Sequence, residues 1–111
     1  MTISFKNLVP PVVVSTSQSS QYTANAVKAV IDKCTVTNTN TVNVAFSVNI
    51  VTTGNLASSS NLIIDAVTIE PNETYMCPET IGQILEAGSF ISTLASVSSS
   101  LTLRISGREL S

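Results

Sequence analysis

The chain contains no histidine and no tryptophan, and only 11% of its 111 residues are charged, against roughly a quarter in an ordinary soluble domain. Without histidine, the most common metal ligand and the most common general base of proteins are missing. A serine nucleophile would then need a lysine as its base. The sequence therefore predicts a protein without catalytic residues, without a metal site and without a cofactor.

Charge of either sign is sparse and scattered. Five basic and seven acidic residues give a net charge of −2. Binding to nucleic acid needs a concentrated basic face. Arg104 and Arg108 can share one face of a strand, and Lys28 and Lys33 lie near each other, but the pattern is typical of solvated surface charges. We expect no nucleic-acid partner.

Long hydrophobic runs are also missing. No stretch approaches the roughly 18 unbroken apolar residues of a membrane-spanning helix. The apolar segment 8–14 is interrupted by Pro10 and Pro11, and it lacks the basic region and cleavage site of a secretory signal. We therefore expect a soluble protein with no membrane partner and no cleaved signal.

The carboxylates lie beside turns. Glu70 and Glu73 flank one turn, and Glu79 and Glu86 lie on either side of a glycine. A two-carboxylate hydrolytic site needs one carboxyl group held neutral in a pocket. A calcium site from Asp65, Glu70 and Glu73 would need more converging oxygens than this segment supplies. We expect these groups to be exposed surface charges.

Two cysteines, Cys34 and Cys77, fall in separate predicted strands. Outside a secretory context such a pair is typical of buried thiols that pack as small hydrophobic side chains. We therefore predict two buried free thiols. The alternatives are a disulfide and a metal or redox role.

What the chain does contain is Ser, Thr and Asn alternating with Val, Ile, Leu and Phe, most clearly over residues 42–50. A period of two is the signature of a half-buried strand. Turn residues recur at intervals near ten residues, as in a sandwich. The prediction is an all-β fold, an antiparallel β-sandwich of jelly-roll-like type with seven to eight strands. The clearest predicted strands are residues 27–37, 42–51, 61–69, 74–77, 90–95 and 101–106.

Details of this pattern predict which residues face the core. Phe46 and Phe90 have the parity of core residues, and Leu62, Ile64 and Ala66 share one parity in their strand. Segment 79–85 is compatible with either a helical turn or a strand.

The first twenty residues differ from the rest. Residues 2–14 are apolar and β-prone, and residues 15–20 are polar and flexible in composition. The sequence therefore divides into an N-terminal arm with a flexible linker, 1–20, and a β-sandwich domain, 21–111. The apolar part is either an edge strand of its own domain or an extended arm exchanged with a neighbouring subunit. Tyr22 follows the linker and can anchor the domain.

A β-rich chain with so few charges risks pairing with itself at exposed sheet edges. It should therefore protect its edges or have a partner that covers them. We expect a homo-oligomer.

Turns and strands have a distinctive spacing over about residues 20–110. The segments concerned are 22–26 leading into Ile31 and Asn38, then 61–64, 71–75 and 81–92, and the closing 105–110. In this spacing the chain resembles small β-sandwich structural proteins of tailed-bacteriophage virions, and Ser89 stands where the pattern often has Asp.

The resemblance implies a non-enzymatic virion component, either a capsid decoration (cement) protein or a head–tail or tail accessory subunit. Such a subunit is made in the host cytoplasm and contacts the major capsid protein or the tail and neck proteins. One alternative is a carbohydrate- or receptor-binding module at a tail or fibre tip, with Tyr22 or Tyr75 in contact with the ligand. Another is a small hydrolase or enzyme accessory domain using Glu79 or Glu86.

Overall fold

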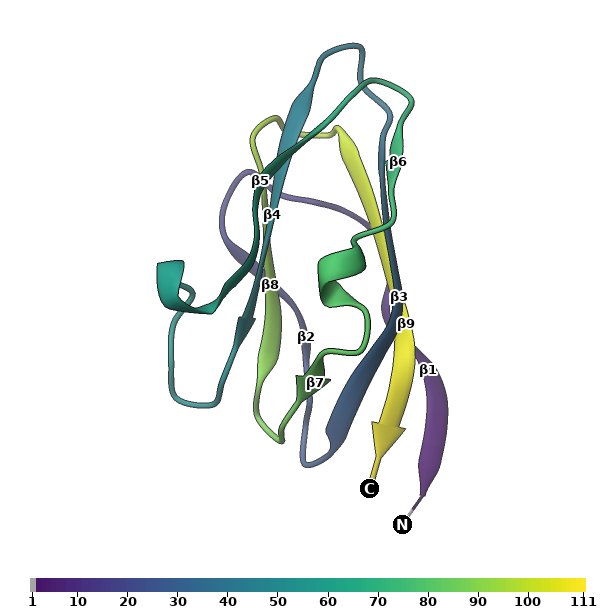
Figure 1. The fold of residues 1–111 in the computed structure, drawn as a ribbon, viewed down its shortest axis with the longest axis vertical. Coiled ribbons are helices and arrows are strands. Elements are labelled where there is room, and N and C mark those ends of the chain that lie inside the picture. The colour runs from purple at the N-terminus through teal and green to yellow at the C-terminus, as the bar shows by residue number, and fades with distance from the viewer. Residues whose placement is uncertain (1) are drawn as a thin grey trace.

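Two antiparallel β-sheets face each other in the computed structural model, which describes residues 2–111 (Figure 1). The strands are β1 (Ile3–Val13), β2 (Ser19–Thr23), β3 (Lys28–Asn38), β4 (Val44–Val51), β5 (Leu62–Ile69), β6 (Thr74–Tyr75), β7 (Ile84–Leu85), β8 (Phe90–Ala95) and β9 (Leu101–Leu110), with short 3-10 helices η1 (Ser59–Asn61) and η2 (Pro78–Thr80). The first sheet has the order β1-β9-β3-β6, with β7 also paired to β3, and the second has the order β2-β8-β4-β5. The predicted all-β antiparallel sandwich is confirmed.

Residues 2–111 form nine strands rather than the expected seven or eight. The ambiguous segment 79–85 supplies most of η2 and all of β7, so it contains both a helical turn and a strand. Residues 90–95 coincide with β8, and the predicted strands 27–37, 42–51 and 61–69 shift by at most two residues at an end. The prediction is less accurate for the other two: β6 has only two of the residues 74–77, so Cys77 lies outside it, and β9 runs four residues past 106.

The extended N-terminal arm is not shown. Residues 3–13 lie within the sandwich as the edge strand β1, paired with β9 along its length. Of the two readings of this apolar segment, the structure has the edge strand in its own domain. Residue 1, the start of the expected arm, lies outside the described residues.

The core lies between the two sheets. It consists of the inward residues of the long strands, such as Ile31, Val36, Phe46, Leu103 and Ile105, none of which is exposed. Phe46 is buried as predicted. The prediction for Phe90 is wrong, because Ile91, Thr93 and Ala95 occupy the core positions of β8 and Phe90 is only half-buried.

A bulge changes the parity of β5. Phe46 pairs with Val67, and Val48 pairs with Ile64. Between these two pairs β4 has one residue and β5 has two. One of them, Ala66, has a left-handed backbone with φ 50°. As a result Ala66 is exposed while Ile64 is buried. A second register shift sets Ile64 opposite Val48 and Leu62 opposite Asn49, which are consecutive on β4 and face opposite sides. The shared parity predicted for Leu62, Ile64 and Ala66 is therefore wrong.

Buried polar side chains tie the strands together at one end of the sandwich. Asn38, at the end of β3, is fully buried. Its amide nitrogen donates to the carbonyl oxygens of Val42 and Ile69, both at 2.8 Å. Its side-chain oxygen accepts the backbone N–H of Asn40 at 2.9 Å. This one side chain therefore joins β3 to the segments that begin β4 and end β5.

Candidate interaction surface

Apolar side chains gather on the outer face of the first sheet, at the end where the chain begins and ends. Cross-strand pairing places Ile3 opposite Leu110, and it places Phe5, Arg108 and Val30 in one row that continues to Ile84. Residues directly opposite each other lie on the same face of a sheet. The adjacent row faces inward, since Ala29 and Leu85 in it are fully buried. We call the outer set the terminal patch: Ile3, Phe5, Val30, Ile84 and Leu110.

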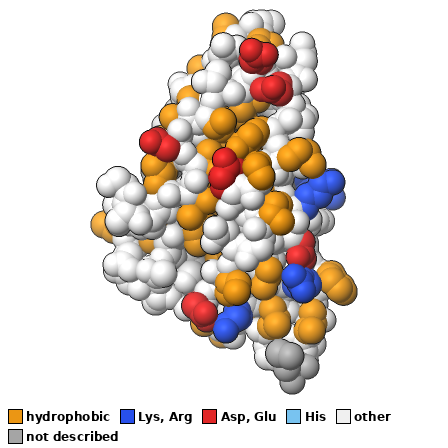
Figure 2. Space-filling view, in the orientation of Figure 1, with side chains coloured by type: hydrophobic (Ala, Val, Ile, Leu, Met, Phe, Trp, Pro, Cys, Tyr) orange, Lys and Arg blue, Asp and Glu red, His pale blue; other side chains and the backbone are white. Residues whose placement is uncertain are grey.

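The terminal patch is strongly exposed for an apolar surface. Phe5 is 83% exposed, Ile84 55% and Ile3 52%. Figure 2 shows hydrophobic side chains gathered among charged ones at this end of the molecule. Contiguous exposed apolar residues with a polar rim mark interaction sites on soluble proteins.

Ion pairs lie within, beside and behind the terminal patch and leave it without net charge. Arg108 stands between Phe5 and Val30 in the outer row, Lys28 lies opposite Leu110, and Lys6 and Glu109 belong to the inward-facing rows. The Arg108 guanidinium donates to both carboxylate oxygens of Asp32, at 2.8 and 3.0 Å. Lys28 pairs with Glu86 at 3.5 Å, and Lys6 with Glu109 at 3.4 Å. Three of the seven acidic and three of the five basic residues belong to these pairs, so the net charge of −2 lies elsewhere on the chain.

The backbone of β1 is open beside this patch. Thr2 and Ser111 exchange two backbone hydrogen bonds, of 2.9 and 3.0 Å. In an antiparallel ladder the bonded positions alternate along the strand. Starting from Thr2, the next residues of β1 that form backbone hydrogen bonds with β9 are therefore Ser4 and Lys6. The N–H and C=O groups of Ile3 and Phe5, which lie between them, point away from β9. β1 ends its sheet, so these groups lie on an open edge.

A polar cluster behind the patch joins the two sheets. The Tyr22 hydroxyl of β2 donates to Glu109 of β9, and the same carboxylate pairs with Lys6 of β1. Burial, and then the hydrogen bond to Glu109, raises the pKa of Tyr22 above its usual range. Tyr22 therefore anchors the second sheet to the first, one of the roles the sequence suggested for it.

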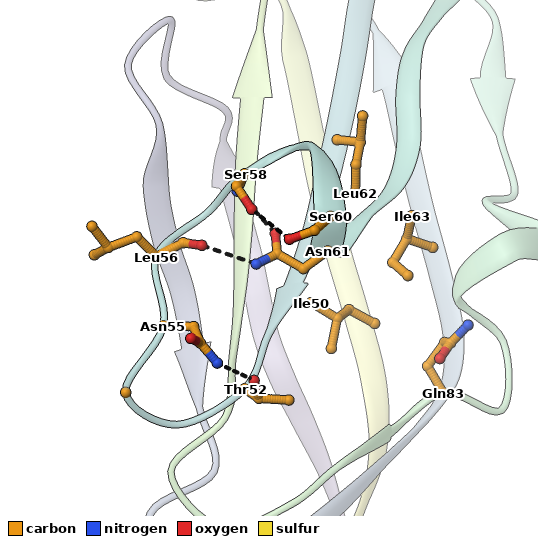
Figure 3. A pocket seen from close by; sticks show the side chains of 11 residues that line it. Ile50, Thr52, Asn55, Leu56, Ser58, Ser60, Asn61, Leu62, Ile63 and Gln83 are labelled. Atoms are coloured by element: carbon orange, nitrogen blue, oxygen red, sulfur yellow. Dashed lines mark hydrogen bonds between the residues drawn. The ribbon is translucent and has the colours of Figure 1, made fainter.

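A hollow on the surface lies between the β4–β5 loop and the segment before β7 (Figure 3). It measures about 750 Å³. Asn61, in its wall, uses its amide within the loop: it donates to the Leu56 carbonyl oxygen at 2.9 Å and accepts from Asn49 and from the Ser58 backbone. Leu56, 83% exposed, points away from the other labelled side chains. Much of the polar wall therefore holds the loop in shape. The hollow is lined by Ile50, Thr52, Gly54, Asn55, Leu56, Ser58, Ser60, Asn61, Leu62, Ile63 and Gln83.

The carboxylates singled out in the sequence do not converge on one site. Glu73 accepts the backbone N–H of Glu70 at 3.0 Å and closes their turn. Glu79 accepts the Tyr75 hydroxyl at 2.6 and 2.7 Å, and burial together with this bond raises the pKa of Tyr75 to about 12. Glu86 pairs with Lys28. Asp65 is exposed in the β5 bulge. Within residues 2–111 there is no group of three or more acidic or cysteine side chains arranged to hold a metal ion.

The two cysteines are brought together. Both are free and fully buried, as predicted. The Cys77 thiol donates to the Tyr75 carbonyl oxygen at 3.7 Å. Interaction with the neighbouring Cys34 thiol, and then burial, raise the pKa of the Cys77 thiol. The pair packs the segment after β6 against β3.

We expect neither thiol to react with a water-soluble thiol reagent while the protein is folded. Both side chains are inaccessible, and reactivity requires an accessible thiolate. The measurement is the number of thiols titrated with and without denaturant, with none expected in the native protein and both after unfolding. Ser17→Cys, at an exposed position, is the control and should react at once. Fast labelling of native Cys34 or Cys77 would contradict the packing described.

Comparison with known proteins found no relative of this chain. No protein-family model, no curated protein and no solved structure matches this chain. Among residues 2–111, no helix is long and apolar enough to cross a membrane.

The residues that define the terminal patch were not singled out in the sequence. Phe5 and Leu110 are on one face only because the two ends of the chain pair with each other. The only signal in the sequence was that a β-rich chain with few charges risks pairing at exposed sheet edges. That signal does not say which edge a partner would cover.

Proposed function

We propose that this protein is a non-catalytic structural subunit of a tailed-bacteriophage particle, a capsid decoration protein or a head–tail or tail accessory subunit, that acts by contact with identical and neighbouring subunits. The observation that carries the proposal is the terminal patch, an exposed, electrically neutral apolar surface beside an open strand edge. Such a surface is suited to being covered by protein.

The rest of the surface supports the same role. Its polarity comes largely from Ser, Thr and Asn, and charged residues make up only 11% of the chain. Neutral groups avoid the desolvation cost that unpaired charges incur when a partner covers them. The resemblance to virion β-sandwich proteins in turn and strand spacing supports the phage setting.

A carbohydrate- or receptor-binding module at a tail or fibre tip is the second candidate, and the hollow beside the β4–β5 loop is the observation that favours it. Gln83 lines this hollow, whereas Tyr22 and Tyr75 do not. Both tyrosine hydroxyls are engaged by carboxylates, so an aromatic platform built from them is not favoured.

The test is the protein content of purified particles. We expect mass spectrometry of particles from the phage that encodes the chain to find its peptides in multiple copies per particle. An abundant non-structural protein of the same lysate is the control and should be removed by purification. Absence of the chain from the particles would overturn the proposal. Glycan-array binding that is lost in Gln83→Ala would favour the second candidate.

A further inference from the structure

We propose that a second copy of this chain pairs with residues 3–6 of β1, antiparallel and across a two-fold axis, so that the first sheets of two subunits become one continuous sheet. This inference rests on the proposed function, because it names the partner and the surface of the self-association expected there.

The free backbone groups fit such a pairing. Ile3 and Phe5 direct their N–H and C=O groups to the open edge, whereas Ser4 and Lys6 are bonded toward β9. With the two-fold axis at Ser4, Ile3 of each copy faces Phe5 of the other. Each of these two pairs then exchanges two backbone hydrogen bonds, and no free group of Ile3 or Phe5 is left over.

The side chains fit the same register. Ile3 and Phe5 are exposed on the outer face, so the pairing sets each phenyl ring against the other copy's isoleucine. Aromatic and β-branched side chains are favourable cross-strand neighbours. The two terminal patches then form one apolar surface across the axis.

The charges allow identical surfaces to meet. The ion pairs of Lys6, Lys28 and Arg108 leave no net charge beside the patch. A strongly charged partner would gain little from this surface. An isologous contact pairs one patch with the same patch of the other copy. Because this patch carries no net charge, two copies can meet here without repelling each other.

The other strand edges are less suited to pairing. The second half of β1 carries Pro10 and Pro11 and two register shifts, which are recognised protections of a sheet edge. β6 and β7 have two residues each, β2 has five, and β5 contains the bulge at Ala66. Residues 3–6 are thus the regular part of the β1 edge, without proline and without a register shift.

Phe5→Glu and Leu56→Glu form a matched pair for the first test. Both side chains are 83% exposed, on β1 and on the β4–β5 loop respectively, so both changes replace one exposed apolar group with one negative charge. Sedimentation velocity over a concentration series of the whole protein measures the dimer dissociation constant. We expect Phe5→Glu to raise it by about tenfold or more, as for loss of a central aromatic contact, and Leu56→Glu to leave it unchanged. Equal effects of the two variants would overturn the assigned surface.

A disulfide tests the register directly and does not depend on weakening the dimer. The axis at Ser4 makes Ser4 and its symmetry mate a non-hydrogen-bonded pair, with Cα atoms about 4.5 Å apart, which is within disulfide reach. We expect Ser4→Cys to form a covalent dimer under mild oxidation with oxidised glutathione, which takes up the two electrons, while Ser17→Cys does not. Equal cross-linking of the two variants, or none in Ser4→Cys, would reject this register.

The outcomes separate this inference from the proposed function. A protein found in particles but monomeric at all concentrations would overturn the inference and leave the virion role standing. A dimer that requires Phe5, formed by a protein absent from particles, would support the inference and overturn the virion role.

Discussion

Replacing Asn38 with aspartate is expected to lower the free energy of unfolding by about 3–5 kcal/mol at neutral pH, the scale for an uncompensated buried charge. The change keeps the size of the side chain but removes both amide donors. The carbonyl oxygens of Val42 and Ile69, each accepting a 2.8 Å bond from this amide, would lose that donor and face a carboxylate. Urea denaturation monitored by circular dichroism measures the loss.

The loss in the Asn38→Asp variant should depend on pH. Burial raises the pKa of the introduced carboxyl group above its value in the unfolded chain. The folded protein then tolerates the protonated form, so the variant is less destabilised at pH 4 than at pH 7, and stability falls as pH rises through the folded pKa. Asn55→Asp, at an exposed position of the β4–β5 loop, is the control. Similar losses in both variants, without a pH trend, would show that Asn38 does not hold these strands together.

The strand pattern was predictable because one face of each long strand packs against the other sheet. Residues 90–95 coincide with β8, and the predicted 27–37 differs from β3 by one residue at each end. Alternation reports which residues face the core wherever the ladder is regular. It fails where the ladder is irregular: nothing in the residues around Ala66 announces a left-handed bulge, since no glycine or asparagine is present there.

The candidate surface was less predictable, because it depends on residues that are far apart in the sequence. Tyr22 and Glu109 bond across 87 positions, and Ile3 and Leu110 become neighbours only through the pairing of β1 with β9. Local periodicity carries no information about such pairings. Composition predicts only a general need for a covered edge, because a charge content of 11% leaves few residues to protect one; which edge is covered, and by what, stays a prediction.

Gly107 of β9 has no room for a side chain, and its replacement by alanine is expected to cost about 3 kcal/mol or more, the upper range for an overpacked core position. A Cβ atom there would lie 2.1 Å from the backbone oxygen of Val30 and 2.9 Å from Leu8 Cδ1. Leu8 can adjust its rotamer, but the Val30 oxygen belongs to the central strand β3. Relief of the clash therefore requires β9 and β3 to separate.

The strain at Gly107 should also reach the edge. Gly107 is paired with Lys6 on β1 as well as with Ile31 on β3, so a displaced β9 moves the strand that we propose as the contact between copies. Thermal or urea unfolding measures the stability, and sedimentation at a temperature where the variant remains folded measures the self-association, which is expected to weaken. Ser106→Ala, at the half-buried neighbouring position of β9, also ends in alanine but adds no atom beyond the Cβ already present, and it should stay within about 0.5 kcal/mol of the unchanged protein. Equal stability of the two variants would show that β9 and β3 have room for a side chain at Gly107. The proposed link between strain at Gly107 and the β1 edge would then be wrong as well.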